Sequence, residues 1–514
     1  MSVGAGIGIY FYGLPRLPQN RLLYNFINWI FQYIYKHFQL SQTIFLILLS
    51  LIMGLILFCI LEIMWVYLDE KPQTSRGSAR WATKKDIKEL INSSGVPIGK
   101  FDGKILRINK THLVTCAGTR SGKGIGAIIP TLLDYQNSII CLDLKGENFA
   151  VTAKRRKQFS DVYCLNPFAL LDIPTNSYNW LDAIKITDAD CIEKSEKLAA
   201  LLVGRSPDNP TENHFNEQAI RLLQGIILFV CSDDDPTTRN ICTVAKLIHN
   251  IPLDDLCNYM SKKESEAFGV ISSIGNQFLN NDNEKEKGSI LSTAQRATNF
   301  LDNPNIRNTL EKSDFDISQL PDKKMSIYLI MPQDKISDFS AYIRVFFDLA
   351  ISSIVSRKER GKHEVLFLLD EVAQIGYLKS LADAVSFLRG LGGQLWFFYQ
   401  SFPQLKNIYG KEANNILGNS TQIYYGCNDQ ETAELISRTL GKKTIKEYDQ
   451  DSKKYHYISK DLLAPNEVRI LKPDKPIIIM SGNHPIQVTR LNYLVDREFK
   501  GLFQRNPYFS GGNS

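Results

Sequence analysis

The chain has 514 residues, of which 44% are hydrophobic and 22% charged, with a formal net charge of +6 at pH 7. This length allows two or three domains with full cores, and the composition excludes a largely disordered chain. So small a net charge neither demands nor excludes nucleic acid as a partner. The nine cysteines include no C-x-x-C pair, which argues against disulfides and metal ligands and favours buried thiols in a reducing compartment.

The N-terminal region contains an uncharged apolar run over residues 43–60, which continues to position 68 with apolar and aromatic residues and one acidic residue, Glu62. This length suffices for a helix across a hydrocarbon core of about 30 Å. Trp65 and Tyr67 stand where interfacial aromatic anchors are expected. A cleaved signal peptide fits poorly, because the run begins too far in and is too long. We therefore predict a membrane span over 43–67, with a buried soluble helix as the less favoured alternative.

An aromatic and apolar stretch precedes this run, at about 22–38, and carries three amide side chains. It predicts either a first span, with a turn at residues 39–42, or an interfacial helix. A hairpin would place these basic residues on one side, which is then the cytoplasmic side: Arg16, Arg21, Lys71, Arg76, Arg80, Lys84 and Lys85. We favour a membrane anchor of two spans in residues 1–70.

The first candidate site is the segment AGTRSGKG at 117–124, between a buried strand at 113–116 and an apolar helix start. A strand, a small-residue loop and a helix form the phosphate cradle of P-loop nucleoside triphosphatases. Backbone N–H groups turn inward there, and the helix N-terminus favours negative charge. Lys123 would reach the β- and γ-phosphates as a point charge.

The segment departs from the usual G-x-x-x-x-G-K-[ST] pattern at two positions. Ala117 replaces the first glycine, and Gly124 replaces the hydroxyl residue that binds Mg²⁺. Ser121 or Thr119 could supply the missing hydroxyl. Taken alone, the segment leaves a structural glycine turn as an alternative.

Further strands are predicted at 137–147, where an apolar run ends in charged residues, and at 161–165, and their apolar character indicates a parallel, doubly wound sheet. The carboxyl ends of such strands carry the chemistry. Asp143, Lys145 and Glu147 lie at the end of the first of these strands, which we expect beside the P-loop strand. Solvated loop charges are the alternative interpretation of these three residues.

From about 183 to 316 apolar residues recur at spacings of three and four, without a convincing strand. This pattern predicts an all-helical insertion that forms its own lobe. The sheet resumes at 325–330, and later elements are a strand at 421–426, a helix at 431–440 and strands at 476–480 and 486–491.

The second half of a nucleotide site follows in the strand at 365–369, which ends in Asp370 and Glu371. This is the Walker B arrangement, in which Asp370 would hold Mg²⁺ and Glu371 would polarise the attacking water. Two such motifs, in this order and each at a strand end, strongly favour a nucleoside triphosphatase over two unrelated structural features.

Another strand, at 394–399, ends in Gln400, which suits a residue that senses the γ-phosphate or positions water. A plain strand cap is the alternative. Arg389 lies at the preceding turn and could reach the nucleotide of a neighbouring subunit, although an ordinary surface arginine is an equally good interpretation.

This set of motifs resembles the type IV secretion coupling proteins, the TraG/TraD-like family of conjugative ATPases. The resemblance covers most of the chain and rests on an N-terminal hydrophobic hairpin followed by TRSGKG (119–124), LDLKGE (142–147), LNPF (165–168), LLDEVAQIG (368–376) and YQSFPQLKNIYG (399–410). In this family the P-loop commonly ends in Gly-Lys-Gly, so Gly124 is a family feature.

The resemblance implies an α/β fold: a RecA-like P-loop domain in two parts, 71–185 and 315–514, an inserted all-α domain at 186–314 and the transmembrane hairpin. It places Lys123, Asp370, Glu371 and Gln400 at the nucleotide, with Arg389 added as a catalytic candidate. The nucleotide-binding residues are then Gly118, Thr119, Arg120, Ser121, Gly122, Lys123 and Gly124, and the cofactors are ATP and Mg²⁺.

The implied function is that of an ATP-driven coupling protein in the bacterial inner membrane, assembled as a hexameric ring with its ATPase body in the cytoplasm. It would recruit relaxase-bound single-stranded DNA or effector proteins and feed them to the secretion channel. The sequence does not choose between these two cargoes. Two alternatives stay open: a double-stranded DNA pump of the FtsK type, and a non-hydrolysing membrane adaptor switched by nucleotide.

Overall fold

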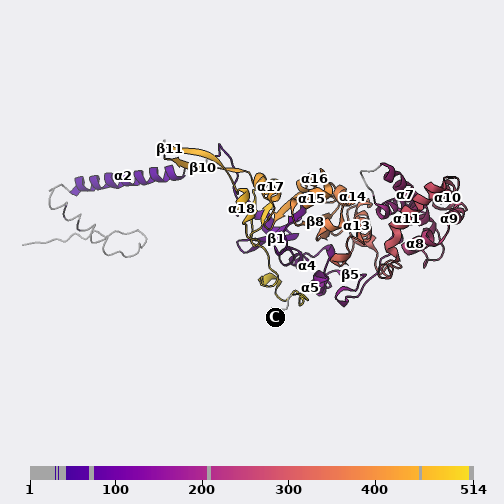
Figure 1. The fold of residues 1–514 in the computed structure, drawn as a ribbon. Coiled ribbons are helices and arrows are strands. Elements are labelled where there is room, and N and C mark those ends of the chain that lie inside the picture. Colours follow the sequence, from indigo (N-terminus) through magenta and orange to yellow (C-terminus); the bar gives the residue numbers. More distant parts are fainter. Residues whose placement is uncertain are drawn as a thin grey trace, which may run out of the picture. The chain divides into compact units, whose positions relative to one another are not determined.

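The computed structural model describes Trp29, Tyr33 and residues 42–68, 74–204, 210–450 and 454–508. The chain divides into two compact units, residues 1–75 and 76–514 (Figure 1). The span predicted at 22–38 lies outside the described residues apart from Trp29 and Tyr33, whose rings stack with centroids 5.6 Å apart.

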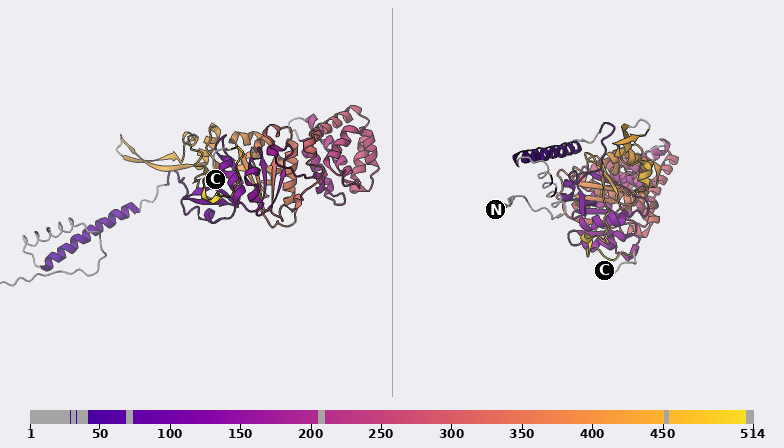
Figure 2. Two further views of the ribbon diagram at one scale, coloured as in Figure 1. Left: turned by 90° about the horizontal axis from the view of Figure 1, so that it is seen from below. Right: turned by 90° about the vertical axis from the view of Figure 1, so that its left-hand side faces the viewer.

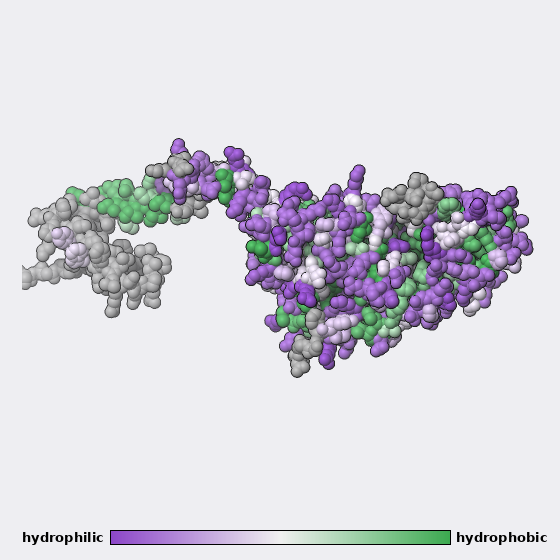
Figure 3. All heavy atoms as spheres, viewed as in Figure 1, coloured by the Kyte–Doolittle hydropathy of each residue, from purple (hydrophilic) through white to green (hydrophobic). Residues whose placement is uncertain are grey.

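The main described element of the first unit is helix α2 (Gln42–Leu68), which coincides with the span predicted at 43–67. The large apolar side chains described along α2 are exposed, Leu55 by 69% (Figure 3). Among the residues whose placement is described, no helix combines the length and the apolar character that a membrane crossing requires.

The second unit is built around a sheet in which nine strands are described (Figure 2). Their bounds are β3 (His112–Cys116), β4 (Ser138–Asp143), β5 (Asp161–Leu165), β6 (Met325–Ile330), β7 (Val365–Leu369), β8 (Gly393–Tyr399), β9 (Ser420–Tyr424), β12 (Ile477–Ile479) and β13 (Ile486–Gln487). Their order is β13-β12-β9-β3-β8-β7-β4-β6-β5. The run from β9 to β5 is parallel, whereas β12 pairs antiparallel with β9, and β13 pairs antiparallel with β12. The predicted α/β fold with a large parallel sheet is confirmed.

The helices of this unit are α3 (Lys88–Asn92), α4 (Ile129–Asp134), α5 (Glu147–Arg156), α6 (Cys191–Val203), α7 (Pro210–Cys231), α8 (Ile241–Asn250), α9 (Leu253–Ser261), α10 (Val270–Leu279), α11 (Glu284–Thr298), α12 (Pro304–Arg307), α13 (Ser340–Val355), α14 (Lys379–Ala384), α15 (Phe402–Tyr409), α16 (Glu412–Gly418), α17 (Gln430–Leu440) and α18 (Pro465–Arg469). A π-helical turn, η1 (Gly124–Ile128), leads into α4. Short 3-10 turns are η2 (Leu170–Asp172), η3 (Trp180–Ala183), η4 (Glu266–Gly269), η5 (Asn299–Asp302), η6 (Ile317–Gln319), η7 (Gln333–Lys335), η8 (Val372–Ile375) and η9 (Arg497–Phe499).

Both faces of the central strands are buried, because successive side chains point to opposite faces and enter different cores. In β8, Leu395 and Phe397 belong to the core that includes α13, whereas Trp396 and Phe398 belong to the core that includes α4. Strands covered on both faces need nearly continuous apolar sequence, which is the pattern that identified them.

Helices α6 to α12 follow one another between β5 and β6, with no strand among the residues described there. They gather at one end of the second unit (Figures 1 and 2). Leu222, Leu223 and Ile226 of α7 are fully buried, in a core continuous with Ile140 and Leu142 of β4. The helical character predicted for 183–316 is confirmed.

Two β-hairpins lie outside the sheet and were not predicted. In the first, β1 (Val96–Phe101) and β2 (Lys104–Ile108) are joined by Asp102 and Gly103, both with positive φ. The second pairs β10 (Lys442–Asp449) with β11 (Lys454–Asp461) and projects from the body as a ribbon (Figure 1). Most side chains of this second hairpin, which we call the ribbon, are exposed.

One predicted neighbour relation is wrong. Strand β4, which ends at Asp143, does not lie beside the P-loop strand β3, because β8 and β7 lie between them. Strands from the second half of the chain therefore enter the middle of the sheet. Before the first hairpin, residues 84–87 form turns, and α3 starts at Lys88.

Candidate functional site

The candidate site lies at the carboxyl edge of the parallel sheet, where β3, β8 and β7 are neighbours. The segment 117–123 leaves β3 and enters η1, which continues as α4. The Ala117 N–H donates to the carbonyl oxygen of Tyr399 at 2.9 Å, which ties the segment to the end of β8. Because all three strands are parallel, the residues that follow them meet at this edge.

The loop conformation requires glycine at one position and leaves space at others. Gly122 has φ +85°, and Ser121 N–H donates to the Gly118 carbonyl oxygen at 3.1 Å. A Cβ added to Gly118 or Gly124 would meet no atom within 4 Å, so one side of the loop is open. The Ser121 hydroxyl is buried and has no hydrogen-bond partner among the described residues. Open space beside backbone amides and an unpartnered hydroxyl suit an anionic phosphate chain.

Lys123 stands between the two carboxylates of the Walker B segment. Its Nζ lies 2.8 Å from Asp370 Oδ1 and also contacts Glu371 Oε1. Burial on its own would lower the pKa of Lys123, but the charges of Asp370 and Glu371 outweigh it and raise the pKa. Burial raises the pKa of Asp370, and the Lys123 ammonium opposes that rise. The lysine therefore stays charged.

Glu371 is held from its other side by the end of β8. Gln400 Nε2 donates to Glu371 Oε2 at 3.2 Å, while the Gln400 N–H donates to Gln404 Oε1 at 2.9 Å. Glu371 has φ +47°, an uncommon conformation for a non-glycine residue. The structure thus brings Lys123, Asp370, Glu371 and Gln400 together, as the sequence predicts.

The same edge offers oxygen ligands for Mg²⁺. No group of three or more His, Cys, Asp or Glu side chains in the described part of the chain could hold a metal ion. Mg²⁺ usually takes only one or two carboxylates, with phosphates and water completing its octahedron. The Asp370 carboxylate and the unpartnered Ser121 hydroxyl fit that requirement, and Thr119 is exposed.

Of the charged residues predicted at the end of β4, Asp143 has a structural role. Asp143 is 1% exposed and accepts hydrogen bonds from Phe149 N–H at 2.9 Å and Lys145 N–H at 3.3 Å. Burial raises the pKa of Asp143 to about 7, against the effect of these two bonds. Asp143 is therefore not a solvated loop charge: it satisfies amide groups at the start of α5.

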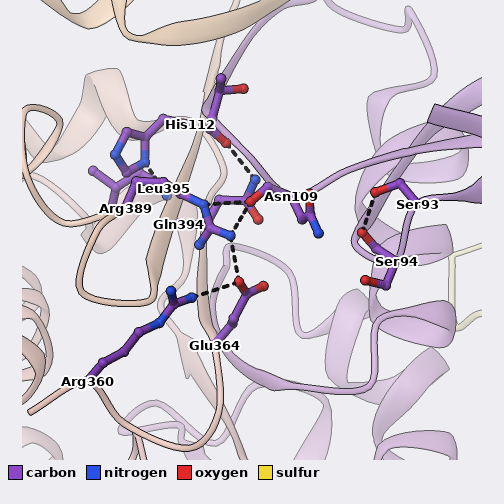
Figure 4. Close-up of polar contacts among 10 residues, drawn as sticks. Ser93, Ser94, Asn109, His112, Arg360, Glu364, Arg389, Gln394 and Leu395 are labelled. Atoms are coloured by element: carbon purple, nitrogen blue, oxygen red, sulfur yellow. Dashed lines mark hydrogen bonds and ion pairs between the residues drawn. The ribbon is translucent and has the colours of Figure 1, made fainter. Parts of the chain in front are cut away.

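Arg389 lies away from the site, at the amino ends of the strands. Its Nε donates to the Asn109 carbonyl oxygen at 2.7 Å, and its Nη2 pairs with Glu364 at 2.6 Å (Figure 4). Asn109 precedes β3 and Glu364 precedes β7, so this cluster is on the opposite edge from Lys123. A role of Arg389 towards a neighbouring subunit stays a prediction.

Sequence reasoning missed Arg490, which touches the loop from outside. Its Nη1 donates to the Ser121 carbonyl oxygen at 2.6 Å, although the two residues are 369 positions apart. No local pattern marks Arg490, because it follows the short edge strand β13. The glycines at 122 and 126, against which it packs, were the available hint.

Most of the chain is similar to proteins of conjugative DNA transfer. Residues 77–508 match the family described as "Type IV secretory system Conjugative DNA transfer". Protein VirD4 of Rhizobium radiobacter is 28% identical over 464 residues, covering 84% of this chain and 66% of that protein. The conjugal transfer protein TraG of Escherichia coli is 30% identical over 417 residues, covering 72% and 65%. The match thus spans about two thirds of the length of these relatives.

Solved structures show the same fold at lower identity. The plasmid coupling protein TrwB in complex with ADP and Mg²⁺ is 17% identical, with a TM-score of 0.62, covering 80% of this chain and 93% of that one. TrwB with a non-hydrolysable ATP analogue gives the same TM-score at 18% identity, covering 80% and 94%.

Proposed function

The chain belongs to the type IV secretory system conjugative DNA transfer family of coupling proteins, and from this premise we propose that it is a coupling ATPase that binds ATP with Mg²⁺ and drives substrate into a secretion channel. The single observation that carries this proposal is the connected group of Lys123, Asp370, Glu371 and Gln400 beside an open glycine loop.

Each of these side chains has a distinct task. Lys123 exchanges its carboxylate partners for the β- and γ-phosphates, which frees Asp370 and Glu371. The Glu371 carboxylate then orients and polarises the attacking water, and Gln400 holds Glu371 in place through the bond seen here. Mg²⁺ would be held by Asp370 with the Ser121 hydroxyl, and when bound it supplies charge neutralisation on the phosphates.

We propose that residues 22–38 and 43–67 anchor the protein in the bacterial inner membrane as a hairpin. The uncharged run at 43–60 and the basic residues that flank the two segments support this orientation, with the ATPase body in the cytoplasm.

We propose that the helical run α6–α12 forms an all-α domain, about residues 186–314, that receives substrates at the cytoplasmic entrance of a homohexamer. Its partners would be channel proteins and either relaxase-bound single-stranded DNA or effector proteins. The names of two relatives, conjugal transfer protein and type IV secretion system-coupling protein, and the family description support a role with a secretion system and DNA.

Substrate transfer through the secretion channel, measured in the source bacterium, tests the proposal. A strain that lacks this gene should regain transfer with the wild-type chain and with the exposed-surface control Glu359→Gln, but not with Glu371→Gln at equal protein level. Wild-type transfer by Glu371→Gln would reject the hydrolytic role and favour a nucleotide-switched adaptor. Failure of the wild-type chain to restore transfer would reject the coupling function itself.

A further inference from the structure

The glycine loop is supported on its outer side by a segment from the far end of the chain. Arg490 follows β13, and its N–H donates to the Asp474 carbonyl oxygen at 2.9 Å. The preceding residue, Thr489, exchanges two backbone hydrogen bonds of 2.8 Å with Lys100. The backbone of Arg490 is thus fixed on both sides, and its guanidinium reaches the Ser121 carbonyl oxygen at 2.6 Å.

Two of the loop glycines are shaped to this arginine. A Cβ on Gly122 would fall on Arg490 Nη1 and lie 2.7 Å from Cζ. A Cβ on Gly126 would meet Arg490 Cγ, Cδ at 2.6 Å and the Leu491 carbonyl oxygen at 2.9 Å. By contrast, a Cβ on Gly118 or Gly124 would meet nothing. The glycines therefore divide into two that leave the phosphate side open and two that admit Arg490.

We propose that Arg490 is a positioning residue that sets nucleotide affinity by holding the phosphate-binding loop in its binding conformation. The inference rests on the proposed function. A charge-assisted bond from the guanidinium keeps the Ser121 carbonyl oxygen turned outward. The amide groups that follow are then left to face the phosphates, and no carbonyl oxygen opposes the anion there. Arg490 acts through the loop and does not touch the nucleotide.

The neighbouring contacts provide a matched control. Lys475 Nζ donates to Thr489 Oγ1 at 2.9 Å, so Lys475 supports the same segment with a cation but does not contact the loop. Like Arg490→Ala, Lys475→Met removes one positive charge that supports the segment around Thr489. A general loosening of this segment would affect Lys475→Met and Arg490→Ala alike.

The first test measures the dissociation constant of ADP with Mg²⁺ by calorimetry on the full chain, together with the nucleotide-free melting temperature. We expect Arg490→Ala to weaken ADP binding about tenfold or more, Arg490→Lys to recover part of that loss, and Lys475→Met to stay within about twofold of wild type. Binding within twofold of wild type in Arg490→Ala would overturn the inference.

A double-mutant cycle with Gly126→Ala keeps the inference testable if Arg490→Ala also lowers the melting temperature. Because the added methyl group mainly meets the Arg490 side chain, Arg490→Ala should cost less affinity in the Gly126→Ala background than in wild type. Strictly additive losses of ADP affinity would overturn the inference.

The same measurements separate this inference from the proposed function. If the wild-type chain does not bind ADP, the proposed nucleotide site fails. If the wild-type chain binds ADP and Arg490→Ala binds it equally well, only the role of Arg490 is rejected.

Discussion

Lys123 is bound to both Walker B carboxylates in the structure, and this has a consequence for nucleotide entry. The lysine has one ammonium group, so it cannot keep Asp370 and Glu371 and also engage two phosphates. Under the proposed function, binding of nucleotide and Mg²⁺ would break ion pairs that are partly buried. The release of Glu371 for water activation would then be coupled to phosphate binding.

Buried His112 gives the fold a pH dependence outside the site (Figure 4). His112 is 1% exposed, and its Nδ1 accepts the Leu395 N–H at 2.9 Å, which requires a neutral ring. Burial, aided by the Arg389 charge, lowers the pKa of His112 from 6.5 to about 4. Below pH 6.5 His112 is protonated in the unfolded chain but stays neutral in the folded chain. The free energy of unfolding therefore decreases as the pH is lowered.

We expect the free energy of unfolding to decrease by roughly 3 kcal/mol between pH 6.5 and 4 through His112 alone. Urea unfolding across this range, compared with His112→Asn, measures the effect. As the pH is lowered, the free energy of unfolding should decrease more in the wild-type chain than in His112→Asn. A difference that does not change with pH would show that His112 is not the cause.

Residues with a local sequence signal lie together at one edge of the sheet. Asp370, Glu371 and Gln400 each follow an apolar strand, and parallel strand ends meet at one edge. Arg490 was missed, because its contact depends on the register of an edge strand 369 positions away from Ser121. Arg389 precedes β8 and therefore lies at the opposite edge of the sheet from Lys123, so its role towards a neighbouring subunit stays a prediction.

At the scale of elements, Arg156 at the end of α5 joins three parts of the fold. This guanidinium is fully buried, and it donates to the carbonyl oxygens of Tyr135 and Asn137 and to Ser326 Oγ in β6. Burial lowers the pKa of Arg156 to about 10. The arginine therefore remains charged and fastens α5 to the α4–β4 connection and to β6.

Arg156→Leu should cost about 3 kcal/mol or more of unfolding free energy, because three buried acceptors lose their donors. The neighbouring Arg155 is only partly buried and serves as the matched control, so Arg155→Leu should cost no more than about 1 kcal/mol. Chemical denaturation of both variants measures this contrast. Equal losses would mean that the buried contacts of Arg156 contribute little.

The ribbon is expected to add little to stability. It is held at its base, where the Ala79 N–H donates to the Lys442 carbonyl oxygen at 2.9 Å and the Thr444 N–H to that of Gly77 at 3.1 Å. Beyond the base most of its described side chains are exposed, Tyr455 by 61%. Replacing residues 446–457 by Asn-Gly should therefore shift the melting temperature by no more than about 2 °C, because little apolar area leaves a core. A fall of about 5 °C or more in thermal unfolding would contradict this.

Elements that bury an apolar face were predicted from the sequence, whereas the two hairpins were not. The ribbon lacks the alternation of apolar and polar residues that marks a half-buried strand. The first hairpin did carry a signal, since Asp102-Gly103 is a favoured two-residue turn. The order of the sheet could not be predicted, because nothing local in β4 reveals that β8 and β7 separate it from β3.

At the scale of the whole molecule, the order of the strands explains how the long helical run α6–α12 can lie between two neighbouring strands of one α/β fold. Strands β5 and β6 pair directly, so the chain leaves the sheet after one and returns to its neighbour. The run α6–α12 can therefore be present without disturbing β3, β7 and β8, which carry the site. The spacing of apolar residues predicted helices between about residues 183 and 316. That these helices share a core with the sheet follows only from the three-dimensional packing.

The central claim is that this site hydrolyses ATP, and phosphate release by the full chain in liposomes tests it most directly. We expect turnover by the wild-type chain, a loss of about 100-fold or more in Glu371→Gln with ATP still bound, and loss of ATP binding in Lys123→Ala. No turnover by the wild-type chain, even with single-stranded DNA added, would contradict the claim, as would undiminished turnover in Glu371→Gln.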